Sequence, residues 1–335
     1  MKLTELDALP EGLLDLPAHR LHERLEGPTL IHLRGAREPA LFVSVLLHGN
    51  EHGGWDALRA LLAARPAGTT LPRSLSILIG NVEAARFRLR HLDHQPDFNR
   101  IWRGASGPEA DVAADVLARM TRRGLLLAVD VHNNTGVNPH YACVTRHDAT
   151  SIALGARFAR PVILVNKPDT VLAAALAHLA PAVILEAGRP GEQRGVEHVG
   201  RYLADLLELE TLPHAPESPV DLYRTVASVK LAPDVHFGFT APGVERDARD
   251  LHLLHEFEHF NFETLEAGTL FGHVPVGAPL PLRVTDDFDR DVAADWFRRE
   301  GDELRFAREV VPAMFSPDVR ILRQDVVCYL MERIG

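Results

Sequence analysis

The sequence has only two cysteines, Cys143 and Cys328, among its 335 residues. That count excludes a disulfide-stapled fold and a cysteine-rich zinc finger, which both need more cysteines. Long apolar runs are missing as well, because no segment reaches the ~18 uninterrupted apolar residues that span a membrane. The N-terminal stretch MKLTELDALPEGLLDLPAHRL has acidic residues and prolines where a signal peptide is continuously apolar. We therefore expect a soluble cytoplasmic protein that does not bind membranes.

An excess of positive charge is also lacking, because 36 Lys and Arg face 46 Asp and Glu and the formal net charge is -10. Proteins that bind the phosphate backbone usually carry a basic face, so nucleic acid is not expected as a partner. Local arginines would still allow an acidic small molecule to bind. The length, with 46% hydrophobic residues, suffices for one large or two ordinary domains. The sequence leaves open whether copies of the chain form a homo-oligomer.

Short apolar runs rich in Val, Ile and Leu predict buried strands in the first two thirds of the chain. They are Thr29–Leu33, Leu41–Leu47, Leu75–Ile79, Leu125–Val131, Val162–Val165 and Ala182–Leu185. Helix-like stretches alternate with them, at about 54–64, 109–123, 151–159, 170–179 and 193–209. This alternation is typical of an α/β domain in which helices cover a largely parallel or mixed sheet.

The pattern changes after TLPHAPESP at 211–219, whose three prolines predict a linker. Beyond it, Val220–Leu231 and Gly268–Pro281 predict short strands between Gly/Pro turns, whereas Arg298–Glu309 is too charged to assign. We therefore predict one domain over residues 1–212 and a smaller, β-rich domain over residues 213–335.

Polar residues follow four of the predicted strands: His48, Asn81, His132 and Glu186. In open α/β sheets, ligands bind at the carboxyl ends of the strands. A buried core would not need polar groups at four such ends. The pattern therefore indicates a functional site at this edge of the sheet.

His48 and Glu51 lie in LLHGNEHGG, whose glycines permit a tight strand-to-helix turn in which residues three apart converge. With His132 from DVHNNTG they would supply two imidazoles and a carboxylate, the protein's share of a catalytic zinc site that keeps one position open for water. Each motif alone has an ordinary alternative. In that alternative, His48 is a capping or core residue and Glu51 is an exposed acid that the helix dipole stabilises. The segment DVHNNTG is then a polar turn after a strand.

His52 extends the first motif to H-x-x-E-H, which resembles the inverted zincin motif of some metallopeptidases. That motif needs a continuous helix, and the strand-like residues before His48 together with Gly49-Asn50 argue against one. We therefore predict His48 and Glu51 as ligands and leave His52 beside the site or at the surface. Asp130, two residues before the third ligand, would orient its imidazole.

Two further segments carry candidate substrate and acid–base groups. Asn99 and Arg100 place an amide beside a guanidinium, whose planar fork suits a carboxylate. Glu186 follows four apolar residues, and burial there would raise its pKa toward the working range of a general base. The alternatives are a solvated helix face for the arginine, and a helix cap or an ion pair with Arg189 for Glu186.

Taken together, these pieces resemble the succinylglutamate desuccinylase/aspartoacylase family, within the zinc carboxypeptidase superfamily, over about residues 40 to 210. The segments that carry the resemblance are HGNEHGG (48–54), GN (80–81), DFNR (97–100), DVHNNTG (130–136) and LEAG (185–188). The resemblance implies a three-layer α/β/α domain with a mixed sheet. It also implies one Zn²⁺ per chain, held by His48, Glu51 and His132.

The same resemblance implies roles for the remaining residues. Glu186 would take a proton from water and later give one to the leaving amine. Asn99 and Arg100 would hold a substrate carboxylate, with Asn133 as a further contact, and Arg90 would polarise the scissile carbonyl. The interval from Arg90 to Arg100 is about two residues longer than the family's usual one.

A second departure concerns the substrate. The name-giving enzymes of the family carry another substrate arginine about ten residues before the general base, but DTVLAAALAHLAPAVILE contains none. Arg189 or Arg194 would have to replace it from the other side. We therefore expect a substrate other than N-acetylaspartate or succinylglutamate.

These observations predict a zinc-dependent amidohydrolase that cleaves the amide of an N-acyl amino acid or a similar small carboxylate-bearing amide. One alternative is a zinc carboxypeptidase acting on short peptides, and another is a non-catalytic metal- or ligand-binding protein. HLLHEFEH at 252–259 is predicted to be a solvated amphipathic stretch rather than a second metal site. Cys143 and Cys328 are predicted to be packing residues.

Overall fold

The computed structural model describes residues 1–66, 68–241 and 246–335. It divides into two compact units, Met1–Asn134 with His140–Asp221, and Thr135–Pro139 with Leu222–Gly335. The division after Asp221 lies beyond the predicted boundary at 212/213. The reason is local packing, because Asp221 donates its backbone N–H to Arg160 O and its carboxylate pairs with the Arg160 guanidinium.

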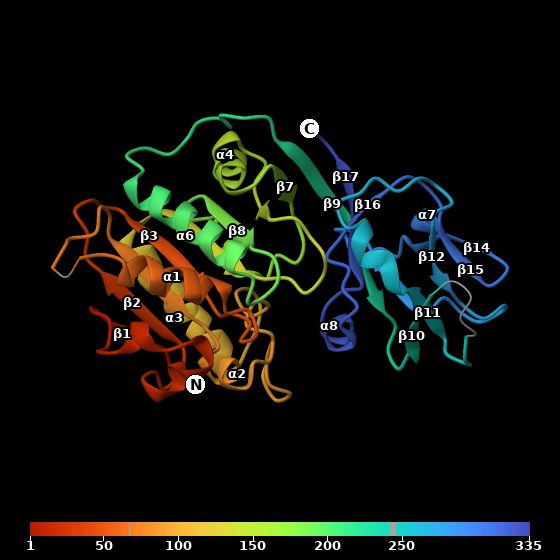
Figure 1. The fold of residues 1–335 in the computed structure, drawn as a ribbon, viewed down its shortest axis with the longest axis horizontal. Coiled ribbons are helices and arrows are strands. Elements are labelled where there is room, and N and C mark those ends of the chain that lie inside the picture. The colour runs from red at the N-terminus through yellow and green to blue at the C-terminus, as the bar shows by residue number, and fades with distance from the viewer. Residues whose placement is uncertain (67, 242–245) are drawn as a thin grey trace. The chain divides into compact units, whose positions relative to one another are not determined.

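The first unit is built on a mixed sheet, whose strands lie in the order β1-β2-β4-β3-β5-β8-β6-β7 (Figure 1). Their bounds are β1 Thr4–Leu6, β2 Thr29–Leu33, β3 Ala40–Val45, β4 Leu75–Ile79, β5 Leu125–His132, β6 Tyr141–Val144, β7 Pro161–Leu164 and β8 Ala182–Glu186. The neighbours β4, β3, β5 and β8 are parallel to one another. Their carboxyl ends therefore meet at one edge of the sheet, as the sequence predicted.

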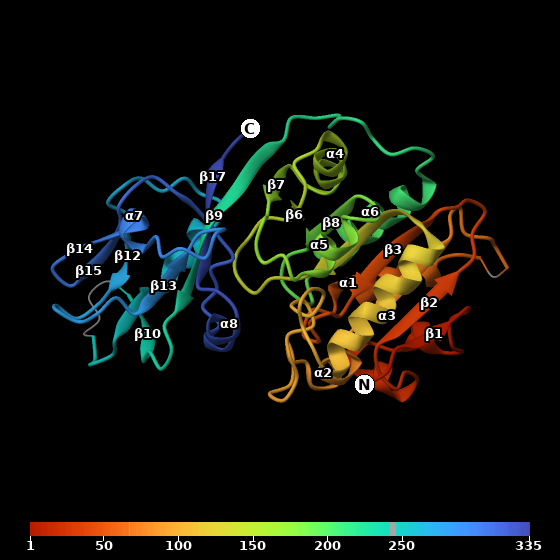
Figure 2. The same cartoon turned by 180° about the vertical axis from the view of Figure 1, so that it is seen from behind.

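Helices cover both faces of this sheet. Their bounds are α1 Gly53–Ala63, α2 Val82–Phe87, α3 Pro108–Arg123, α4 Ala149–Phe158, α5 Leu172–Leu176 and α6 Gln193–Glu208, with the 3₁₀ turns η1 Leu13–Asp15 and η2 Ala18–Glu23. Helices α1 and α6 pack together on one face (Figure 1), and α3 lies on the other (Figure 2). The predicted layered α/β fold with a mixed sheet is thus confirmed, and the structure adds β1 and α2, which the sequence pattern did not reveal. Among the described residues, no helix is both long and apolar enough to cross a membrane.

Helix α3 illustrates how the sequence sets these elements. Pro108 opens it at a position where a missing N–H costs nothing, and Gly124 ends it in the left-handed region at φ 77. Val112, Val116 and Met120 recur at helical spacing and are all buried. One stripe of the helix therefore faces the sheet while its charged residues face solvent.

The second unit contains two sheets around a core of its own. The first joins β9 Asp221–Leu231, β17 Cys328–Arg333 and β16 Val311–Ala313, with β13 Leu282–Thr285 on the other side of β9. The second has the order β10-β11-β12-β15-β14, with bounds β10 Phe237–Thr240, β11 Leu251–Leu254, β12 Leu270–His273, β15 Glu303–Phe306 and β14 Phe297–Glu300. The short helices are η3 His255–Phe260, α7 Ala293–Trp296 and α8 Val319–Gln324. The unit is β-rich, as predicted, and its apolar core draws on both sheets.

Two segments of this unit differ from the sequence-based expectation. The unassigned stretch Arg298–Glu309 contains most of an antiparallel hairpin, β14–β15, in which Leu304 and Phe306 point into the core while the charged residues alternate outward. The predicted strand Gly268–Pro281 shortens to β12, because the remaining residues form turns and irregular segments.

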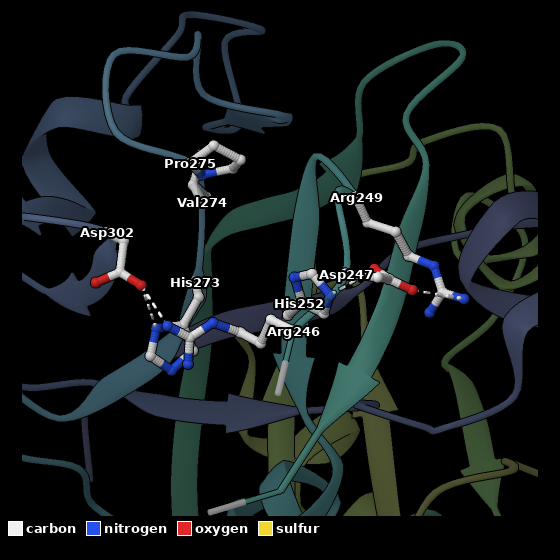
Figure 3. Close-up of a pocket in the computed structure, with 8 residues that line it drawn as sticks. All are labelled: Arg246, Asp247, Arg249, His252, His273, Val274, Pro275 and Asp302. Carbon is white, nitrogen blue, oxygen red and sulfur yellow. Dashed lines mark hydrogen bonds and ion pairs between the residues drawn. The ribbon is translucent and has the colours of Figure 1, made fainter. Parts of the chain in front are cut away.

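The histidine-rich stretch 252–259 is amphipathic, because His255, Glu256 and His259 are exposed whereas His252 in β11 is buried. It borders a cavity of about 420 Å³ in which each of two aspartates bridges an arginine and a histidine (Figure 3). Asp302 pairs with Arg246 and lies near His273, and Asp247 pairs with Arg249 and His252. The charges that line this cavity therefore compensate one another.

Phe257 lies at the centre of the second unit's core, in ring contact with Phe260, Phe271, Phe306 and Phe315. We expect Phe257→Ala to lower the free energy of unfolding by about 3–5 kcal/mol, because it removes a fully buried ring and leaves a cavity. Thermal or denaturant unfolding measures the loss.

Phe288→Ala is the matched control, since 77% of the Phe288 side chain is exposed, and it should change stability by less than about 0.5 kcal/mol. Equal effects of the two substitutions would contradict the assignment of Phe257 to the core.

Candidate metal centre and active site

The loop after β3 carries the first two candidate ligands. Leu46 takes a left-handed conformation, with φ 58, and turns the chain out of the strand toward His48. Glu51 then donates its backbone N–H to His48 O, which closes a tight turn before α1 begins at Gly53. Gly49 is essential to this path, because a Cβ there would lie 2.2 Å from Ala85 N. The strand-to-helix turn expected from the glycines is therefore present.

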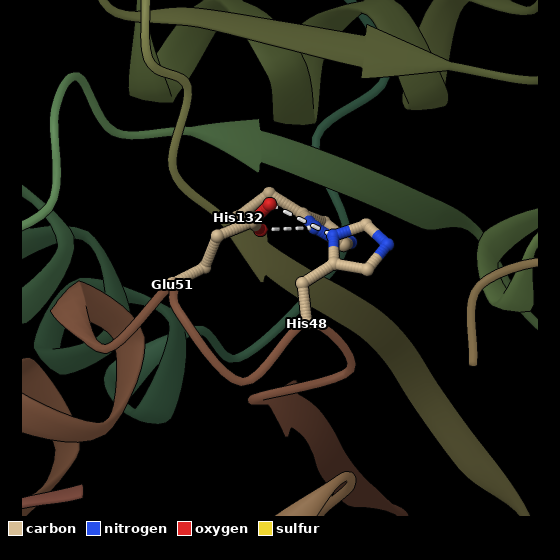
Figure 4. A group of neighbouring side chains, drawn as sticks. All are labelled: His48, Glu51 and His132. Atoms are coloured by element: carbon tan, nitrogen blue, oxygen red, sulfur yellow. Dashed lines mark hydrogen bonds and ion pairs between the residues drawn. The ribbon is translucent and has the colours of Figure 1, made fainter. Parts of the chain in front are cut away.

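Figure 4 shows that the turn brings His48, Glu51 and His132 together. His48 Nδ1 lies 2.8 Å from Glu51 Oε1, and His132 Nδ1 lies 2.7 Å from Glu51 Oε2. One ligand atom from each residue falls within 4.8 Å of the others, and all three residues are buried. In the described part of the chain, His48, Glu51 and His132 form the one group of at least three potential metal ligands whose donor atoms lie close enough to hold an ion.

The electrostatics of the group fit a divalent cation. Burial would raise the pKa of Glu51, but the two imidazoles outweigh it and hold that pKa far below its usual range. Burial lowers the pKa of His132, yet Asp130 and Glu51 raise it well above the ordinary value. Burial and Arg90 lower the pKa of His48, but Glu51 and Asp97 outweigh them and raise it. The surroundings therefore favour two positive charges at this point. A divalent ion bound through both Nδ1 atoms would take the place of those two protons.

The far ring nitrogens point at carboxylates, which is the second feature that fits a metal. His48 Nε2 lies 3.0 Å from Asp97 Oδ1, and His132 Nε2 lies 3.0 Å from Asp130 Oδ2. A carboxylate beside the outer nitrogen helps to hold the ring of a metal-binding histidine so that Nδ1 faces the ion. The donor set and its supports therefore suit zinc, for which imidazole and carboxylate are usual ligands.

Glu186 ends β8 directly beside His132, since the two residues are register partners on neighbouring parallel strands. Its side chain is buried, and among the described residues its Oε2 has no hydrogen-bond partner. Burial raises the pKa of Glu186 to about 7, with Glu51 adding to the effect and the nearby cationic groups opposing it. A carboxyl group with such a pKa can both accept and return a proton near neutral pH.

The predicted substrate groups lie close by. Arg90 is buried, donates from Nε and Nη2 to Asp97 Oδ2, and places Nη1 3.7 Å from Glu51 Oε1. Asn99 Nδ2 lies 3.2 Å from His132 Nε2, while Asn99 Oδ1 accepts the backbone N–H of Leu172 at the start of α5. Arg100 is half-buried next to Asn99 and donates to its carbonyl oxygen.

Other candidates have different surroundings. The Asn133 amide bridges two backbones, accepting from Gly53 N and donating to Gly188 O, so both of its ends hold the loops together. Its role in substrate binding remains a prediction. His52 points its Nδ1 at Asp56 on α1 and lies outside the ligand group.

Two more predicted positions lie outside the ligand group. Asn81 caps α2 by accepting from Ala84 N, and its amide donates to Gln95. Arg189 is half-buried in the loop between β8 and α6, where its backbone N–H donates to Glu192. Neither residue joins the three candidate ligands, and Arg189 remains a prediction for substrate binding.

Two further residues support the site, although the sequence pattern did not single them out. Asp97, the first residue of DFNR, joins His48 to Arg90. Ser44, inside the apolar strand β3, donates to Asp130 Oδ1. The only signal for Ser44 was a polar residue in an otherwise apolar run, and that signal does not name a partner on another strand.

Residues 37–197 match the sequence model of the succinylglutamate desuccinylase/aspartoacylase catalytic domain. Among curated protein sequences, none matches this chain.

Solved structures share the fold. Succinylglutamate desuccinylase from Chromobacterium violaceum is 20% identical with a TM-score of 0.56, covering 90% of this chain and 86% of that one. Murine aminoacylase 3 is 17% identical with a TM-score of 0.55, covering 89% and 97%. The product-bound ectoine utilization protein EutE (DoeB) from Ruegeria pomeroyi is 17% identical with a TM-score of 0.57, covering 91% and 88%.

Gly49→Ala tests the close approach that shapes the ligand turn. The added Cβ would meet the backbone of Ala84 and Ala85 at 2.3 and 2.2 Å, so we expect a loss of about 1–3 kcal/mol in stability and weaker metal binding as His48 and Glu51 shift. Thermal unfolding and metal analysis of the purified protein measure the two effects.

Gly27→Ala serves as the control, because nothing lies within 4 Å of a Cβ built there. A Gly49→Ala protein with unchanged stability and metal content would show that the turn does not depend on this contact.

Proposed function

Because this chain carries a catalytic domain of the succinylglutamate desuccinylase/aspartoacylase family over residues 37–197, we propose that it is a zinc-dependent amidohydrolase. It would cleave the amide of an N-acyl amino acid or a similar small amide that bears a carboxylate. The observation that carries the proposal is the convergence of His48, Glu51 and His132 within 4.8 Å, beside a Glu186 whose pKa burial raises to about 7.

The zinc would be held by His48 Nδ1, Glu51 and His132 Nδ1. When bound, it supplies Lewis acidity, which lowers the pKa of water and polarises a carbonyl. Asp97 and Asp130 would help keep the two rings turned toward it, since a carboxylate oxygen of each lies 3.0 Å from the Nε2 atom of its ring.

Glu186 performs the proton transfers in this proposal. Its Oε2, which has no hydrogen-bond partner among the described side chains and backbone, accepts a proton from water. Because burial keeps its pKa near neutrality, the same group then gives the proton to the leaving nitrogen. The register pairing of His132 with Glu186 supports this role, because it brings the two residues side by side on neighbouring strands.

The arginines would position and polarise the substrate. Arg90 is held by Asp97 through Nε and Nη2, which orients its Nη1 toward the ligand group and suits it to stabilise charge on the carbonyl oxygen. Arg100 would bind the substrate carboxylate, since a planar guanidinium fits a carboxylate with two parallel hydrogen bonds. Asn99 fixes the start of α5 beside His132.

The sequence of α5 narrows the substrate class. The helix is LAAAL, and residues 169–186 contain no arginine. A substrate with a second carboxylate would lack a cationic partner from this segment. We therefore propose a monocarboxylate N-acyl amino acid rather than N-acetylaspartate or succinylglutamate. Because one structural neighbour is an aminoacylase, N-acyl amino acids are the compounds to test first for hydrolysis.

The central test combines metal analysis with Glu186→Gln. The wild-type protein, purified without chelator, should contain zinc and hydrolyse members of an N-acyl-amino-acid panel that includes short peptides. Glu186→Gln keeps the shape but cannot accept the proton, so kcat should fall by about 100-fold or more while zinc content stays the same.

Glu197→Gln, on the exposed side of α6, is the matched control and should keep full activity. A wild-type protein without zinc, or a Glu186→Gln protein with undiminished kcat, would refute the proposed reaction. Efficient trimming of peptides longer than about four residues would favour a carboxypeptidase instead.

Arg100→Ala tests the carboxylate contact. We expect KM for a carboxylate-bearing substrate to rise about 10- to 100-fold, because a charge-assisted bidentate pair contributes about 1.5–3 kcal/mol. The same substitution should hardly change the already poor hydrolysis of the matching carboxamide, which has no charge to bind. Steady-state kinetics on the two compounds measure the difference.

Arg103→Ala provides the control, because Arg103 is an exposed residue paired with Asp169. Equal losses on the acid and the carboxamide would argue that Arg100 has only a structural role.

A further inference from the structure

A row of polar side chains crosses the sheet beneath the ligand group. Ser44 on β3 and Asp130 on β5 are register partners on adjacent parallel strands, and the Ser44 hydroxyl donates to Asp130 Oδ1. Asp130 and His132 are two residues apart on the same strand, so their side chains project from the same face. Asp130 Oδ2 lies 3.0 Å from His132 Nε2.

All of these groups are enclosed. Ser44 is 0% exposed and Asp130 is 3% exposed, in strands that are otherwise made of apolar residues at this depth. A buried hydroxyl and a buried carboxylate are costly unless each finds a partner. Alanine or valine would pack at position 44 without that cost. The Ser44 hydroxyl is therefore not needed for packing, which indicates that its hydrogen bond to Asp130 has a role of its own.

The contact has a geometric consequence for the metal. A carboxylate can turn about the bond that joins it to its Cβ, and the Ser44 hydroxyl holds one of its oxygens. The other oxygen is thereby kept opposite His132 Nε2. A carboxylate fixed in this way keeps its charge beside the outer edge of the His132 ring and limits the rotation of that ring, so that Nδ1 stays directed at Glu51 and the ion.

We propose that Ser44 is a positioning residue for the metal, acting on His132 through Asp130. This inference rests on the proposed zinc site and adds a residue that touches neither the ion nor the substrate. Its effect is on the affinity for zinc itself.

The expected loss of zinc affinity depends on how many contacts separate a residue from the ion. Removing the direct partner of a metal-binding histidine typically weakens binding about 10- to 100-fold, which is the loss we expect for Asp130→Asn. Ser44 stands one contact further out, so Ser44→Ala should weaken zinc binding by a smaller factor, about 3- to 10-fold. The readout is the zinc dissociation constant, measured by competition with a chelator of known affinity.

Ser76→Ala is the matched control. Ser76 is also a fully buried serine in a parallel strand, β4, and its hydroxyl also contacts a histidine, His32 Nδ1 at 2.9 Å. Its removal should disturb packing to a similar degree but leave zinc affinity unchanged. Equal weakening by both substitutions would overturn the proposal, because it would reveal a general effect of core disturbance.

A double-mutant cycle isolates the route through Asp130. If Ser44 acts only by holding that carboxylate, then Ser44→Ala added to Asp130→Asn should cause little further loss of zinc affinity. Fully additive losses would overturn the proposal. If Ser44→Ala lowers stability, the rise in Tm caused by saturating zinc still reports the affinity of the folded form, and it should be smaller than in the wild-type protein.

The outcomes also separate this inference from the proposed function. A wild-type protein that binds no zinc overturns both. A wild-type protein that binds zinc, with Ser44→Ala binding it equally well, overturns only the role of Ser44.

Discussion

The carboxylate of Glu51, held between two imidazole nitrogens, is the interaction on which the site depends. Its two oxygens face His48 Nδ1 and His132 Nδ1 at 2.8 and 2.7 Å. These groups belong to separate parts of the chain, and they meet only because β3 and β5 are adjacent and parallel. The buried ring nitrogens carry their own carboxylates on the far side, so the protein encloses a compact cluster of alternating charge. Such a cluster is stable only if every member has a partner, and it suits a divalent ion for the same reason.

The acidic residues around this cluster differ in their protonation because their surroundings differ. The pKa values of Glu51 and Asp97 are held low by the imidazoles and, for Asp97, by Arg90. Glu186 lies one strand away in an apolar setting, where burial raises its pKa to about 7. Carboxyl groups with different pKa values can take different roles. In the proposed site, Glu51 is a ligand, Asp97 supports a ligand and Glu186 accepts the proton. The sheet creates this division by placing Glu186 next to His132, where burial outweighs the nearby positive charges and raises its pKa.

Much of the fold was predictable from local pattern. Apolar runs such as Thr29–Leu33 and Leu75–Ile79 became β2 and β4 at the predicted bounds, because strands covered on both faces need little besides Val, Ile and Leu. The hairpin β14–β15 was not predicted, because its exposed face is charged and only a few of its residues are buried and apolar. In the stretch 252–259, the sequence could not separate the exposed His255, Glu256 and His259 from His252, which is buried and pairs with Asp247. Side chains that bury polar atoms against distant partners give no local signal.

The sequence alone determined the types and order of the chemical groups: His48 and Glu51 after one strand, His132 after another and Glu186 after a third. It could do so because strand ends and glycine turns leave a local pattern. Only the tertiary structure decided which nitrogen of each ring faces the ion, that Asn133 bridges two backbones, and that Ser44 and Asp97 support the site. Those assignments depend on the lateral pairing of strands and on loops folded over the edge of the sheet. Such contacts join residues far apart along the chain, and the linear sequence does not encode them in any short-range pattern.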